Sequence, residues 1–182
     1  MIACVAVGAF GVGPDTGTAE ADTADAEFGR ALDRHAGAAW YPEARLVMDE
    51  WTERALAAGD PHEVEQMMRT VLPLYTAHPD RAGVAAGLDA LGPSITFDLA
   101  AVKAWEAGLY QTIDLRPLLA KITSPTLVVA GDLDFLCGPA QARPICEAIR
   151  GAQLEIIRDC GHFPSFEAPE AYREAVQRFL EA

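Results

Sequence analysis

Two stretches of this sequence decide the fold: TLVVAGDLD at residues 126–134 and QLEIIRDCGH at residues 153–162. Each is a short apolar run that ends in polar side chains, the pattern of a buried parallel strand followed by a loop. In open parallel sheets, the groups that do chemistry collect at the carboxyl ends of the strands. If these two strands are neighbours, Asp132 or Asp134 can reach His162. An aspartate that holds a histidine Nδ1–H fixes the tautomer used in acyl transfer.

The residues around these strands predict an α/β fold. Pro139 and Pro169 each stand where a proline opens a helix, so the chain runs strand, helix, strand, helix with short joints. That order implies a parallel sheet with right-handed crossovers. The apolar run at residues 1–9, MIACVAVGA, fits a further strand buried on both faces. We therefore expect a short parallel sheet of about three strands, flanked by helices.

The long stretch at residues 15–121 carries helix signals only. Apolar residues recur on one helical face over 44–55. The Asp-Pro pair at 60–61 provides an N-cap and a first-turn proline for another helix, and Asp98 and Asp114 cap two shorter segments. We expect three regions: a first core strand and exit loop at 1–14, a helical region at 15–121 and a C-terminal α/β part at 122–182.

Composition and charge exclude several classes of protein. The chain carries 27 acidic and 14 basic residues, a formal charge of −13, and nucleic-acid binding needs clustered Lys and Arg instead. The apolar run at the start is shorter than the roughly 20 residues that span a bilayer, and it lacks the positive flank of a secretory signal. We therefore expect a cytoplasmic protein that binds neither membrane nor nucleic acid. The four cysteines match no zinc pattern and are expected to be free thiols.

The two strand ends resemble a known family. GDLD at residues 131–134, followed by DCGHFPSFEAPEAY at 159–172, is similar to the C-terminal third of the α/β-hydrolase superfamily. The resemblance implies a partial α/β-hydrolase fold in which Asp134 is the triad acid, favoured over Asp132 by its spacing from Gly131, and His162 is the base. The helical stretch that begins at Pro42 is similar to the cap of the proline iminopeptidase-like branch. That branch implies a serine hydrolase that acts on an amide or ester of a small molecule or peptide, without a cofactor.

The sequence departs from the family at the nucleophile. Members carry a strained G-x-S-x-G turn before the acid and the histidine, whereas Ser94, Ser124 and Ser165 all lie outside such a turn. On this resemblance the nucleophile would precede Met1, and the chain alone is expected to be inactive. It would be a fragment, a product of a mis-assigned start, or a half-protein completed by a complementary hydrolase half. The alternative is an inactive remnant or interaction subunit that pairs or self-associates through its exposed sheet edge.

The remaining titratable residues have simpler interpretations. His35, His62 and His78 are expected at the surface. Cys137 either lines the site beside Asp134 or is a small buried apolar residue. A metal site made of Cys137, Cys160 and His162 is disfavoured, because the spacing is wrong and a fourth ligand is missing. No metal is therefore expected, and the acidic side chains of the helical region receive no role.

Overall fold

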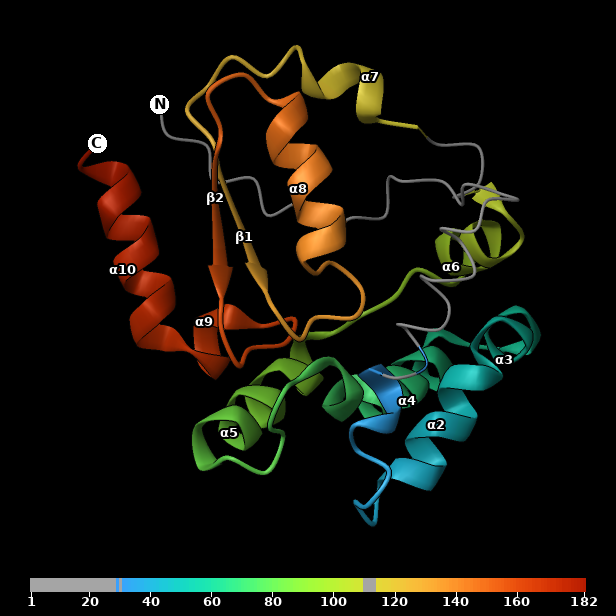
Figure 1. Ribbon diagram of the computed structural model, residues 1–182. Coiled ribbons are helices and arrows are strands. Elements are labelled where there is room, and N and C mark those ends of the chain that lie inside the picture. The colour runs from blue at the N-terminus through green and yellow to red at the C-terminus, as the bar shows by residue number, and fades with distance from the viewer. Residues whose placement is uncertain (1–28, 30, 110–113) are drawn as a thin grey trace.

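The computed structural model describes residues 29, 31–109 and 114–182. Its elements fall into a mainly helical part and a C-terminal part with a sheet (Figure 1). The helices of the first part are α2 (Tyr41–Asp49), α3 (Trp51–Ala57), α4 (Pro61–Val71), α5 (Ala82–Leu91), α6 (Leu99–Glu106) and α7 (Arg116–Leu119), with 3₁₀ turns η1 (Leu72–Tyr75) and η2 (Gly92–Ser94). The second part contains β1 (Leu127–Gly131), α8 (Pro139–Ala148), β2 (Gln153–Ile157), α9 (Pro164–Glu167) and α10 (Pro169–Leu180).

The two strands pair in parallel, as their apolar runs predict. Leu127 lies opposite Gln153 and Gly131 opposite Ile157, so both strands end at the same level. Figure 1 shows α8 and α10 on either side of the strand pair, and α8 makes the crossover between β1 and β2. In the described ranges the sheet has two strands instead of the expected three or so. The expected strand at residues 1–9 lies outside the described residues.

Helices α2 to α5 lie beyond the carboxyl ends of the strands, whereas α7 lies near their amino ends beside α8 (Figure 1). The core of the helical part forms where α2 and α4 pack together, because one stripe of α4 buries Val64, Met67 and Val71. Full burial of such a side chain stabilises the fold by about 1.5–3 kcal/mol. The buried cluster consists of Leu32, Ala44, Val47, Ala55, Met67, Val71 and Leu74. The strand ends therefore face a packed helical layer.

The expected caps are present, with one shift in position. Asp60 accepts a hydrogen bond from the amide of His62 at 2.7 Å, and Asp98 accepts one from Ala101 at 2.8 Å. Asp114 accepts from the amide of Arg116 at 3.0 Å, but α7 begins only at Arg116, so the aspartate lies two residues before the helix. The Asp-Pro signal therefore located the start of α4 correctly.

The prediction of one continuous helix over residues 44–55 was wrong. The chain turns at Glu50, which separates α2 from α3. After this turn, the Trp51 indole donates to one carboxylate oxygen of Glu106 at 2.8 Å, and Thr52 donates to the other at 2.7 Å. These two hydrogen bonds join α3 to α6, a contact across more than 50 residues that local periodicity does not encode.

Gly131 is required where β1 ends. A methyl group on Gly131 would lie far inside contact distance of the carbonyl oxygens of Cys160 and Gly161. We predict that Gly131→Ala lowers the free energy of unfolding by about 1–3 kcal/mol, the usual cost of overpacking, as measured by urea denaturation. Gly83→Ala in α5 is the matched control, because a methyl there meets nothing within 4 Å. Equal effects of the two substitutions would contradict this packing argument.

Candidate active site

The two loops at the ends of β1 and β2 bring a carboxylate and an imidazole together. Oδ2 of Asp134 lies 2.9 Å from Nδ1 of His162. The other oxygen of Asp134 accepts the amides of Leu136 and Cys137 at 2.9 and 3.0 Å, so the loop fixes the orientation of the carboxylate. The Asp134 side chain is 4% exposed and that of His162 is 24% exposed. The Asp134 carboxylate is therefore almost fully buried, whereas the His162 ring is partly accessible to solvent.

Backbone hydrogen bonds continue the strand pairing into these loops. The amide of Asp132 donates to Ile157, and the amide of Leu133 donates to Cys160, both at 2.9 Å. Asp159 turns the second loop with a φ of 55°, a left-handed conformation that aspartate tolerates better than most residues. The loops are thus held side by side for several residues past the strands.

The structure separates the two candidate acids. Oδ1 of Asp132 accepts the amide of Cys160 at 3.4 Å, and its Oδ2 lies 3.6 Å from the Arg158 guanidinium. Asp134 is the carboxylate that meets His162, as the spacing in the sequence suggested. The catalytic role of the pair remains a prediction, whereas its contact is a feature of the fold.

The surroundings of His162 change its proton affinity strongly. Burial of the ring lowers the pKa, but hydrogen bonds and charge from Asp134 and Cys137 outweigh burial and raise the pKa of His162 to about 10. The ring also contacts Tyr75 and Phe163, with centroid distances of 5.6 and 5.0 Å. Burial raises the pKa of Tyr75 to about 12, so this phenol stays neutral. Asp134 and Cys137 therefore stabilise the imidazolium, and the rings of Tyr75 and Phe163 pack against it.

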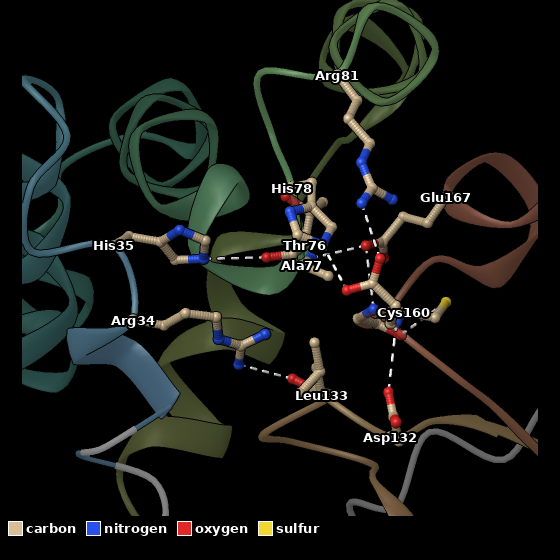
Figure 2. A network of polar contacts seen from close by, with 12 residues as sticks. Arg34, His35, Thr76, Ala77, His78, Arg81, Asp132, Leu133, Cys160 and Glu167 are labelled. Carbon is tan, nitrogen blue, oxygen red and sulfur yellow. Dashed lines mark hydrogen bonds and ion pairs between the residues drawn. The ribbon is translucent and has the colours of Figure 1, made fainter.

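Glu167, at the end of α9, holds the loop that carries His162. Its Oε2 accepts the amides of Gly161 at 3.0 Å and Ala77 at 2.7 Å, and its Oε1 accepts the amide of Phe163 at 2.9 Å. The residues on both sides of His162 are therefore bound to one carboxylate, which also binds the helical part through Ala77 (Figure 2). Charge-assisted hydrogen bonds of this kind are about twice as strong as neutral ones.

Gly161 lets the same loop approach the segment after η1. A methyl group on Gly161 would collide with the carbonyl oxygen of Tyr75 and lie 2.9 Å from the amide of Ala77. The amide of His162 donates to that Tyr75 oxygen at 2.8 Å. The Gly-His sequence is therefore needed because the histidine loop and the helical part touch through their backbones.

Figure 2 shows two further side chains from the segment before α2, one of which joins the helical part to the strand-end loops. Nη2 of Arg34 donates to the carbonyl of Leu133, next to Asp134, at 2.8 Å. Nε2 of His35 bonds to the carbonyl of Thr76 at 3.0 Å. The expectation that His35 lies at the surface was wrong: it is 9% exposed, and burial lowers its pKa.

The other two histidines are more exposed. The His62 side chain is 75% exposed, as expected, and its Nδ1 lies 2.8 Å from Glu65. His78 is partly exposed and pairs with Asp159 at 2.6 Å, beside Arg81 at 2.7 Å. Hydrogen bonds from His78 and Arg81 lower the pKa of Asp159. These contacts hold the turn at Asp159, two residues before Gly161.

The cysteines divide into two environments. Cys160 is fully buried, its thiol points to the carbonyl of Gly161, and burial raises its pKa to about 12. Cys137 is partly exposed and lies at the site, where ligand atoms of Cys137, Asp134 and His162 are all within 4.8 Å of one another. Of the two interpretations of Cys137, the structure supports the one in which it lines the site.

Comparison with known proteins gives one family. The family model described as alpha/beta hydrolase fold matches residues 47–169. A 2-hydroxy-6-oxononadienedioate/2-hydroxy-6-oxononatrienedioate hydrolase from Klebsiella pneumoniae is 35% identical over 79 residues, which is 43% of this chain and 27% of that protein. An Escherichia coli protein with the same name is 37% identical over the same length.

Solved structures agree on the fold. The enol-lactonase from Burkholderia xenovorans superposes with a TM-score of 0.56 at 25% identity, over 74% of this chain and 51% of that one. An esterase from Exiguobacterium antarcticum gives 0.54 at 20% identity, over 78% and 48%, and supports the fold alone. The chain spans about half the length of these solved structures and about a quarter of the curated relatives it matches. Within the described ranges, no helix is long and apolar enough to cross a membrane.

The Glu167 contacts generate a prediction about stability. Glu167→Gln places an amide NH₂ group among backbone donors and removes the charge that strengthens their hydrogen bonds. We predict a loss of about 1.5–3 kcal/mol in the free energy of unfolding, measured by urea denaturation. Glu174→Gln on the exposed face of α10 is the control and should change stability by less than about 0.5 kcal/mol. A Glu167→Gln variant as stable as the control would show that this carboxylate does not hold the loop.

Proposed function

Because the chain belongs to the α/β-hydrolase fold family, we propose that Asp134 and His162 are the acid and the base of a hydrolase active site. The observation that carries this proposal is the 2.9 Å contact between the buried Asp134 carboxylate and Nδ1 of His162. With Nδ1 held by Asp134, proton exchange with a reacting hydroxyl falls to Nε2. His162 would take the proton of a nucleophile and return it to the leaving group.

The nucleophile has to come from outside these 182 residues, since the sequence contains no G-x-S-x-G turn. We propose that a complementary polypeptide or segment supplies this turn and pairs with the sheet along its exposed edge. In the described part of the chain, β1 pairs with β2 alone. An unpaired edge of an apolar parallel strand presents a row of donors and acceptors that favours such pairing.

The proton affinity of His162 supports the need for a second half. A general base works best when its pKa is near the working pH. Asp134 and Cys137 raise the pKa of His162 to about 10, which favours the protonated ring in this chain alone. A docked half that covers the exposed side of the ring would add desolvation, which lowers the pKa of a histidine. Assembly would therefore lower the pKa of His162, so that the ring can act as a base, and would also supply the nucleophile.

For the substrate, we propose a small ester, lactone or 2-hydroxy-6-oxo acid with an electrophilic carbonyl carbon. The named relatives are a dienedioate hydrolase and an enol-lactonase, and neither is a proline iminopeptidase. Of the amide and ester substrates that the cap resemblance implied, these names favour the ester, and they add the oxo acid. All three reactions can use the same acid and base, because each adds a nucleophile to a carbonyl carbon.

Co-expression with the neighbouring reading frame that encodes G-x-S-x-G tests the proposal. We predict that a fluorophosphonate probe labels the serine of the partner rapidly only in the complex. His162→Ala or Asp134→Asn should slow ester hydrolysis by roughly 10²–10⁴-fold, since each removes part of the general base. Asp132→Asn is the matched control, because Asp132 follows the same strand but bonds to Cys160 and Arg158.

Three outcomes would contradict the proposal. Labelling of the partner serine without this chain, or labelling and hydrolysis that persist in His162→Ala, would remove the acid–base role. Absence of any neighbouring frame with G-x-S-x-G would favour the alternative, an interaction subunit without catalysis.

A further inference from the structure

The site contains a third chemical group that the acid–base pair does not require. Ligand atoms of Asp134, Cys137 and His162 all lie within 4.8 Å of one another. Asp134 is buried, while Cys137 and His162 are partly exposed, so a small solute can approach from one side. Cys137 and His162 of the disfavoured metal set lie together, but the Cys160 thiol points to the Gly161 carbonyl, and Asp134 stands in its place.

The three groups form a ligand set with a clear chemical preference. A thiolate, an imidazole and a carboxylate are the side chains that bind Zn²⁺, and three protein ligands with one open position are typical of accessible zinc sites. Thiolate ligands disfavour Mg²⁺ and Ca²⁺, which prefer oxygen. The set therefore selects thiophilic divalent cations.

The geometry needs only a small adjustment. Ligand atoms around tetrahedral zinc, at about 2.0–2.3 Å from the metal, lie roughly 3.2–3.6 Å apart. Oδ2 of Asp134 and Nδ1 of His162 are 2.9 Å apart already, and the amides of Leu136 and Cys137 hold the other carboxylate oxygen. Those two atoms would move apart by a few tenths of an ångström, and the Cys137 thiol, which already bonds to His162, would approach by rotation about its one χ angle.

We propose that Asp134, Cys137 and His162 bind a thiophilic divalent cation such as Zn²⁺. On binding, the Cys137 thiol and any proton on the ligating imidazole nitrogen are released to solvent, and water fills the fourth position. The bound ion occupies the carboxylate and the imidazole, so metal binding and acid–base chemistry at this pair exclude each other. The proposal concerns binding only, so it stands whether or not the chain forms part of an active hydrolase.

Metal titration of the purified chain under reducing conditions tests the proposal. Calorimetry with Zn²⁺ should give one site, and Co²⁺ should produce the near-ultraviolet absorption of a cobalt–thiolate bond. Cys137→Ser should abolish that absorption and weaken Zn²⁺ binding by at least about tenfold, and His162→Ala should weaken it similarly. Cys146→Ser is the control, since its thiol lies against the carbonyl of Ala152 at 3.5 Å, and it should change neither signal.

Two results would overturn the site. One is a Zn²⁺ dissociation constant above about 1 mM in the unaltered chain, too weak for a three-ligand site. The other is binding that survives both Cys137→Ser and His162→Ala, or that is lost on Cys4→Ser, since either would place the ion elsewhere. Circular dichroism of each variant separates loss of the site from loss of the fold.

Discussion

The parallel pairing of β1 with β2 is the constraint on which the site depends. Because Gly131 lies opposite Ile157, both strands stop at one level and their loops leave the sheet together. Backbone hydrogen bonds from Asp132 and Leu133 then extend the contact beyond the strands. A shift of one residue in this register would carry Asp134 away from His162. The contact between Asp134 and His162 is thus a consequence of sheet geometry more than of the two side chains themselves.

The helical part reaches the pair mainly through backbone contacts. Tyr75 accepts the amide of His162, and Ala77 shares the Glu167 carboxylate with Gly161. From the segment before α2, Arg34 binds the carbonyl next to Asp134. Movement of the helical layer would therefore move both loops. This coupling gives the helices a physical role at the site even though they carry neither Asp134 nor His162.

Local signals in the sequence predicted part of this architecture. Apolar β-branched runs located β1 and β2, proline and aspartate signals located the starts of α4, α8 and α10, and the strand-end rule with the family resemblance pointed to Asp134 and His162. Helix α5 falls inside the stretch expected to be helical, but its alanines and glycines give no amphipathic period that would locate it. The turn at Glu50 was missed because the apolar positions keep one helical face on both sides of it.

The supporting residues of the site could not be read from the sequence for the same reason. Glu167 binds Ala77 across 90 residues, Arg34 binds Leu133 across 99, and His35 binds Thr76 across 41. No periodicity or spacing records such pairings, since they arise only when segments far apart in the sequence pack together. The only hint was the Glu at 167 in the stretch that resembles the hydrolase family, and a resemblance alone says nothing about which amides the carboxylate binds.

An NMR titration of the His162 ring shows whether the Asp134 carboxylate stabilises the imidazolium. We expect a pKa of about 10 in the unaltered chain. In Asp134→Asn the pKa should fall, because the charge of the carboxylate is lost while burial, which lowers the pKa, remains. A His162 pKa that is the same in Asp134→Asn as in the unaltered chain would show that this carboxylate does not stabilise the imidazolium.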